Sequence, residues 1–382
     1  MSLSLPKPAA LRAFCLLCCA VLLSLNATSQ AAVYQQGAMQ FDGVPDANQQ
    51  PIDPALWLRL DQYLASRDAS FVDWMEPGQG VLIKTRFDET HQLHWVKAPA
   101  SQRQQLTFGD NPVLNGRAVQ GGSTPQILFL RDQQGDENFQ IFHSDLHTGH
   151  TQALGADGAR QGVLTPGHRP GLFAFYTTQR NGRDWDLHSL QLPLSYLEEP
   201  ESGRWRDWVL SGAFVVDEVV TQTVHREKGT WLPLDWSPDD QWLLALNVES
   251  GGISLPYLLK SDRSESVPLY PKDERAAYMD GRFADDGQAI FLLSNRGREF
   301  IGLFRLDLLS GELNLALDLP HDIEQLDVSP DGKVLALVVN ENGYSRLYLF
   351  QSIDMQAITL PAIPDGVIEN LRFSADSQQL GF

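Results

Sequence analysis

Cysteine is absent from almost all of this 382-residue sequence. Its three cysteines, Cys15, Cys18 and Cys19, lie together in one apolar run near the N-terminus. Disulfides therefore cannot stabilise the rest of the chain, which depends on its core. Long apolar runs are also scarce, and none reaches the ~20 residues that a membrane-spanning helix needs. The sequence predicts neither a disulfide-rich scaffold nor a membrane span.

The N-terminal segment has the pattern of a secretory signal peptide. Lys7 and Arg12 precede the apolar run at 14–23, and small residues follow up to Ala31. We expect residues 1–31 to be removed. The mature protein is therefore predicted to be exported, to the periplasm or outside the cell.

Positive charge is scarce. The sequence has 29 Lys and Arg against 48 Asp and Glu, a net charge of −19, which becomes −21 without the two basic residues of the signal. Such a balance argues against nucleic acid as a partner. Two interpretations stay open: acidity that keeps an exported protein soluble, and an acidic funnel that attracts cationic substrates.

A nucleophile elbow is also missing, because no serine has glycine two residues before it and two residues after it. Ser123, Ser254 and Ser345 have only the preceding glycine. Each falls in a loop or strand of a repeat instead of between a strand and a helix. We interpret them as structural and predict no catalytic residue, so the chain by itself is not expected to be an enzyme.

One group of residues has the chemistry of a metal site. His143, Asp145 and His147 alternate along a predicted strand, and His150 follows. Two histidines and a carboxylate can hold zinc. Polar side chains on the solvent face of a strand are the more ordinary explanation, so we assign no metal-binding residue, no cofactor-binding residue and no cofactor.

What the sequence does contain is a repeated phrase, typified by Leu-Asp-Trp-Ser-Pro-Asp-Asp at 234–240. The residues before its Ser or Ala are 47, 45 and 45 residues apart, which is the length of a four-stranded propeller blade. Each phrase precedes an apolar strand, a turn and an alternating strand. Degraded copies begin near residue 71. The four marker residues are Trp236, Phe283, Val328 and Phe373.

The sequence therefore predicts an all-β fold, a propeller of four-stranded WD40-like or TolB-like blades with six complete blades and the start of a seventh. The propeller should occupy residues 69–382, incomplete at its C-terminus, with a blade insertion at about 192–230. An arm at 32–68 should contain a short helix, because Asp53 and Pro54 suit a helix start. An incomplete seventh blade would leave a strand edge open and favour aggregation.

Four aromatic residues fall just before turns of the repeat, at Trp74, Trp236, Phe283 and Phe373. They could form a stacking surface for a ligand. Their equivalent positions favour packing between neighbouring blades, where burial of each is worth about 1.5–3 kcal/mol.

Four further segments are distinctive: Ala-Ser-Phe-Val-Asp-Trp at 69–74, Ile-Lys-Thr-Arg-Phe at 83–87, Gln-Leu-Thr-Phe at 105–108, and Pro-Leu-Asp-Trp-Ser-Pro-Asp at 233–239. These segments resemble the N-terminal half of bacterial serine peptidases of the prolyl oligopeptidase family. The resemblance covers nearly the whole mature chain. It implies a propeller that limits which peptides reach a C-terminal α/β-hydrolase domain carrying a Ser-Asp-His triad.

The family's catalytic residues have no matching positions in this sequence. Dipeptidyl members use a Glu pair after an Asp-Trp, but Asp207 and Trp208 are followed by Leu210 and Ser211. The pair at 198–199 lies upstream and is better explained as solvated. This departure weakens any assignment of dipeptidyl specificity.

The resemblance predicts the substrate-gating, non-catalytic propeller of an exported serine peptidase, with peptides as substrates and the hydrolase domain as its partner. A self-standing periplasmic propeller of the TolB kind, which binds protein partners, is the alternative. The product of a frameshifted peptidase gene is a third. Neither the substrate nor the oligomeric state follows from the sequence.

Overall fold

The computed structural model divides the chain into two units, Met1–Ser66 and Arg67–Phe382. In the first unit, helix α2 (Pro54–Leu64) confirms the predicted helix. No helix in the described part of the chain is both long enough and apolar enough to span a membrane. The predicted signal segment lies outside the described residues, as does 194–218 of the predicted insertion. The structure describes residues 54–64, 67–87, 90–122, 124–155, 158–193, 219–271, 274–284 and 287–382.

The second unit is made of antiparallel sheets, each built from consecutive strands. Six sheets have four strands and the seventh has two. The first three blades are β1 (Ala69–Trp74), β2 (Val81–Thr85), β3 (Gln92–Val96) and β4 (Arg103–Gln105); β5 (Val113–Val119), β6 (Gln126–Arg131), β7 (Gln140–Asp145) and β8 (Thr151–Ala153); β9 (Gln161–Pro166), β10 (Leu172–Thr177), β11 (Asp186–Gln191) and β12 (Val220–His225). The next three are β13 (Thr230–Trp236), β14 (Trp242–Ser250), β15 (Ile253–Lys260) and β16 (Ser266–Pro268); β17 (Tyr278–Phe283), β18 (Ala289–Ser294), β19 (Gly302–Asp307) and β20 (Leu313–Leu317); β21 (Asp322–Val328), β22 (Val334–Glu341), β23 (Tyr344–Gln351) and β24 (Ala357–Ile358). The seventh sheet is β25 (Arg372–Phe373) and β26 (Leu380–Gly381).

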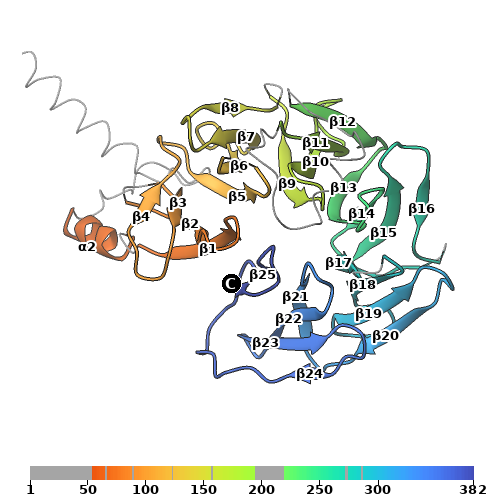
Figure 1. Ribbon diagram of the computed structural model, residues 1–382. Coiled ribbons are helices and arrows are strands. Elements are labelled where there is room, and N and C mark those ends of the chain that lie inside the picture. Colours follow the sequence, from red (N-terminus) through yellow and green to blue (C-terminus); the bar gives the residue numbers. More distant parts are fainter. Residues whose placement is uncertain are drawn as a thin grey trace, which may run out of the picture. The chain divides into compact units, whose positions relative to one another are not determined.

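These sheets are the blades of a propeller, arranged around a common centre (Figure 1). The first strand of each blade lies innermost and the fourth outermost. Neighbouring inner strands contact each other, as β9 does β13 and β17 does β21. The prediction of an all-β propeller with six complete blades and the start of a seventh is confirmed.

The Ser-Pro-Asp phrase closes the turn between the first two strands of a blade. In blade 4 the Ser237 hydroxyl donates to the Asp239 carboxylate over 2.6 Å and accepts the Trp242 backbone N–H over 2.9 Å. Ser329 and Ser374 make the same pair of bonds in the sixth and seventh sheets. The phrase recurs in the sequence because short polar side chains satisfy the backbone of a tight turn.

Apolar side chains fill the spaces between blades. Trp236, at 1% exposure, packs in a cluster with Leu172 and Tyr176 of blade 3. Phe283 packs with Leu244 of the preceding blade in the same way. Trp236 and Phe283 are therefore core residues between blades, as predicted, whereas Trp74 is only partly buried.

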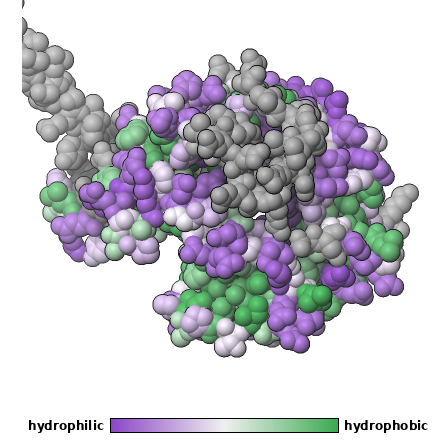
Figure 2. Space-filling model, in the orientation of Figure 1, coloured by the Kyte–Doolittle hydropathy of each residue, from purple (hydrophilic) through white to green (hydrophobic). Residues whose placement is uncertain are grey.

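The seventh sheet lies between blades 6 and 1. Phe373 packs with Ala336 and Val338 of β22, and β26 contacts β1. Among the described residues β26 pairs with no strand other than β25. Apolar residues gather over the sixth blade on the face shown in Figure 2, where Leu347 and Leu349 of β23 are only half-buried. The inner position of the seventh blade is thus filled, whereas its outer positions are not filled by any described strand.

Candidate functional site

Seven side chains occupy equivalent positions on the seven inner strands, and we call them the inner ring. Each belongs to the inner-strand residue that pairs with the equivalent position on the second strand of its own blade. For example, Asp73 pairs with Leu82, and Asp235 pairs with Leu244. A β-bulge directly precedes both aspartates, and bulges re-aim side chains in many sheets. In chain order the inner ring is Asp73, Arg117, Thr165, Asp235, Arg282, Asp327 and Arg372.

The aspartates of the inner ring fasten each blade to the next through backbone amides. Oδ2 of Asp73 accepts the N–H of Ala118 over 3.1 Å. Oδ2 of Asp235 accepts that of Phe283 over 2.8 Å. Oδ2 of Asp327 makes the corresponding 2.8 Å bond with the seventh sheet. Charge-assisted bonds of this kind are stronger than neutral ones and fix the rotation of neighbouring blades.

The other inner-ring residues also link neighbouring blades. Nε of Arg117 donates to the Leu164 carbonyl over 3.0 Å, and the Thr165 hydroxyl donates to the Pro233 carbonyl over 3.1 Å. Nε of Arg282 lies 3.6 Å from Oδ1 of Asp327. These contacts join blades 2 to 3, 3 to 4, and 5 to 6.

The seventh sheet is linked to blade 1 by similar polar contacts. Nε of Arg372 lies 3.5 Å from Oδ1 of Asp73 in blade 1. The Trp74 indole donates to the Arg372 carbonyl over 2.9 Å, and the Asn370 amide donates to the Phe71 carbonyl over 2.9 Å. Polar contacts therefore run through all seven inner positions and back to the first.

Burial shifts the pKa values of some inner-ring residues. Burial raises the pKa of Asp235 to about 6, although Arg282 and the Phe283 N–H oppose the rise. Burial likewise raises the pKa of Asp327. Burial and the nearby Arg372 together lower the pKa of Arg117 to about 9, although Asp73 opposes this effect. The ring is thus a set of partly desolvated charges of both signs.

His168 lies beside the inner ring in the turn between β9 and β10. Its Nδ1 is 3.4 Å from Oδ1 of Asp240, which also accepts the His168 N–H over 2.8 Å. Burial lowers the pKa of this imidazole, but the bond with Asp240 and the nearby Asp235 outweigh that effect and raise it. The contacts of His168 with Asp240 join blades 3 and 4.

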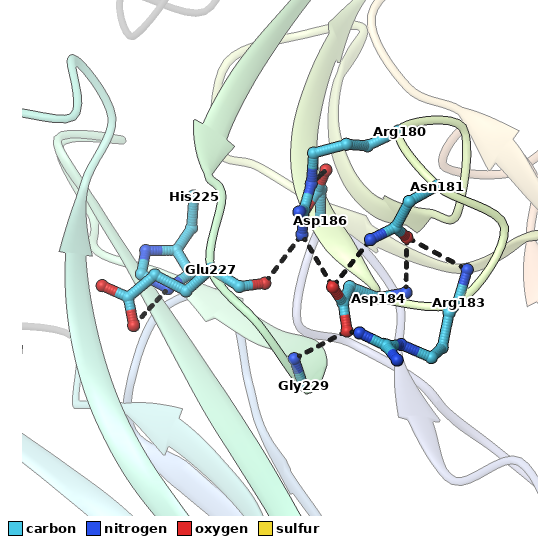
Figure 3. Close-up of polar contacts among 8 residues, drawn as sticks. All are labelled: Arg180, Asn181, Arg183, Asp184, Asp186, His225, Glu227 and Gly229. Carbon is cyan, nitrogen blue, oxygen red and sulfur yellow. Dashed lines mark hydrogen bonds and ion pairs between the residues drawn. The ribbon is translucent and has the colours of Figure 1, made fainter.

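A second charged cluster lies in the turn between β10 and β11 and contains Arg180, Asp184 and Asp186 (Figure 3). The Arg180 guanidinium makes two bonds to Asp186, of 2.7 and 2.8 Å, and one of 3.3 Å to Asp184. Asp184 also accepts the Gly229 N–H. Because each charge in this cluster has partners, we interpret it as a structural clamp.

The candidate serines have structural roles where they are described. Oγ of Ser254 accepts the Tyr278 N–H over 2.9 Å, and Oγ of Ser345 accepts the Ile368 N–H over 3.0 Å. Each bond ties a third strand to the segment that follows its blade. Ser123 lies outside the described residues.

The histidine group at 143–150 does not converge. His143 is buried and its Nε2 lies 2.8 Å from Oε1 of Gln126. Strand β7 ends at Asp145, so His147 falls in the following turn, where its N–H and that of Thr148 bind Oδ1 of Asp145. No cluster of three or more metal-ligating side chains occurs in the described ranges. Residues 198–199 and 207–211 lie outside them.

The repeated phrase itself contains a signal for the inner ring. The residue before each of the four marker residues alternates in charge, in the order Asp235, Arg282, Asp327 and Arg372. The first three blades have degraded phrases, so Arg117 and Thr165 become equivalent to these only through the strand register.

No protein-family model and no curated protein sequence matches the chain. Its fold matches solved structures. A prolyl endopeptidase gives a TM-score of 0.61 at 13% identity, over 91% of this chain and 49% of that one. The fold is a β-propeller. Puromycin hydrolase gives a TM-score of 0.58 at 14% identity, over 85% of this chain and 51% of that one.

An oligogalacturonate lyase, solved in complex with manganese, also matches. Its TM-score is 0.59 at 12% identity, over 83% of this chain and 87% of that one. Identities this low establish a shared fold and nothing finer. This chain spans about half the length of the prolyl endopeptidase and puromycin hydrolase chains.

Proposed function

We propose that this chain is the non-catalytic, substrate-gating propeller of an exported serine peptidase, whose Ser-Asp-His triad lies in a C-terminal α/β-hydrolase domain. Peptides are the proposed substrates. Export rests on the signal-like segment at 1–31.

The observation that carries this proposal is that family-like segments of the sequence form part of the first blade of a fold that matches a prolyl endopeptidase. The segments at 69–74 and 83–87 that resemble the prolyl oligopeptidase family form β1, β2 and the turn after it. The fold match to a prolyl endopeptidase covers 91% of this chain. A charged inner ring also suits a propeller past which polar peptide backbones move, since its partly solvated groups can exchange partners with a peptide.

The experiment is labelling by a serine-reactive fluorophosphonate probe. The exported fraction of the source organism is treated with the probe, and the protein is recovered by antibodies to this propeller. We expect covalent labelling together with hydrolysis of short peptides, both blocked by prior treatment with an unlabelled fluorophosphonate.

The matched control is the arm and propeller alone, residues 32–382, which lack a nucleophile elbow and are expected to remain unlabelled. If the native protein is also unlabelled and hydrolyses no peptide, the peptidase role is wrong. Co-purification of a stable protein partner in that case would favour a binding propeller.

A further inference from the structure

The alternation of charge around the inner ring is interrupted in blade 3. Acidic and basic residues alternate from Asp235 through Arg282 and Asp327 to Arg372, and then continue through Asp73 to Arg117. An acidic residue would follow next, but the position holds the neutral Thr165. Seven positions cannot alternate completely, so one defect is unavoidable, and it lies beside Arg117.

This defect leaves Arg117 different from the other two arginines. Arg282 has Asp280 and Asp327 as ion-pair partners, and Arg372 has Asp73. Within the described residues, Arg117 hydrogen-bonds only to backbone carbonyls, those of Leu164 at 3.0 Å and Gly116 at 3.4 Å. A guanidinium offers five N–H donors in a planar fork, so most of its capacity is unused here.

The neighbouring carboxylate is already engaged. Asp73 attracts Arg117 through space, but its Oδ2 accepts the Ala118 N–H and its Oδ1 faces Trp74 N at 3.0 Å and Arg372 at 3.5 Å. Arg372 also repels Arg117, and together with burial it destabilises the charged guanidinium. An anion supplied from outside would relieve both effects.

We propose that the inner ring binds a carboxylate at Arg117, beside Thr165. A planar carboxylate matches the guanidinium fork through two parallel hydrogen bonds. The carboxylate belongs either to a small organic anion or to the C-terminus of a peptide. The site is formed by the inner strands alone, so it does not depend on the proposed peptidase role.

The test is the thermal unfolding midpoint of the purified protein at constant ionic strength. Three probes are titrated separately: acetate, N-acetyl-trialanine with a free carboxylate, and N-acetyl-trialanine amide. A ligand that binds the folded state raises the midpoint with its concentration. We expect a saturable rise of about 2 °C or more with a carboxylate probe and none with the amide. A rise with the peptide acid alone identifies a peptide terminus, and an equal rise with acetate identifies a general small anion.

Two variants locate the effect. Arg117→Gln should lose the carboxylate-dependent rise. Thr165→Asp gives Arg117 an internal carboxylate partner, so it should also lose the rise. Arg346→Gln, at an exposed arginine of blade 6 outside the ring, should keep it.

The proposal is overturned if neither carboxylate probe shifts the midpoint, if the amide acts equally, or if Arg117→Gln and Thr165→Asp retain the full shift. Thr165→Asp keeps the test decisive if Arg117→Gln does not fold. The thermal midpoint does not depend on peptide hydrolysis. Failure of the carboxylate site can therefore be distinguished from failure of the peptidase proposal.

Discussion

The interface between blades 3 and 4 differs from the contact that the seventh sheet makes with blade 1. Both contain an inner-ring bond, Thr165 to Pro233 in one and Arg372 to Asp73 in the other. The first also buries a large apolar cluster that includes Trp231 and Trp236, each 1% exposed. The second depends on Trp74 and a two-stranded sheet. Polar contacts thus run around the whole ring, whereas apolar burial is unequal, and we expect opening to begin at the seventh sheet.

The largest expected effect comes from removing a buried aromatic side chain between blades. Trp236→Ala should lower the free energy of unfolding by about 3–5 kcal/mol, because it removes a fully buried ring and leaves a cavity. Phe373→Ala, at 9% exposure in a smaller cluster, should cost roughly half as much. Denaturant unfolding measures both. Equal losses would show that the interface between blade 6 and the seventh sheet is as well packed as the interface between blades 3 and 4.

The next effect concerns the charge of Asp235 and its pH dependence. Its pKa is raised from 3.8 to about 6 by burial. The folded state therefore binds more protons than the unfolded state between these values, so this residue's contribution to stability is full below about 3.8 and is lost as the pH rises through about 6.

Asp235→Asn should remove this loss while its amide oxygen still accepts the Phe283 N–H. We expect the variant to gain roughly 1–3 kcal/mol relative to the native protein between pH 4 and pH 7. Urea unfolding at a series of pH values measures the difference. A difference that is constant with pH would contradict the raised pKa.

A smaller effect is expected at the closing contact. Arg372→Gln removes a half-buried ion pair with Asp73 and should cost about 1 kcal/mol. Hydrogen exchange should accelerate in β25 and β26 more than in β13, because only the former depend on this contact. Uniform acceleration across the propeller would mean that the ring opens as one unit.

The smallest effect serves as the baseline. Arg346 and Asp365 form an exposed ion pair in blade 6, away from the inner ring. Arg346→Ala should change the free energy of unfolding by less than about 0.5 kcal/mol, since exposed pairs are weak. A larger loss in the free energy of unfolding, measured by the same urea unfolding, would show that losses of this size are not specific to inner-ring residues.

Much of the fold could be predicted from the sequence. The Ser-Pro-Asp phrase is a local device, in which Ser237 closes its own turn, and its spacing of about 45 residues depends only on blade length. Strand positions and the blade-to-blade packing of Trp236 followed from it.

The inner ring could be predicted only in part. Asp235 and Arg282 stand out beside their aromatics, but Arg117 is followed by Ala118 and Thr165 by Pro166. A shift of one residue in a strand moves a side chain to the opposite face. The bulges that set the register in the early blades leave no clear mark in the sequence, so equivalence there required the structure.

The most direct test of the proposed function is the intact mass of the native exported protein in its source organism. The account predicts a mass larger than that of this chain by roughly 250 residues or more, the size of a further domain. A mass equal to that of residues 32–382 would contradict the peptidase role and leave a self-standing binding propeller.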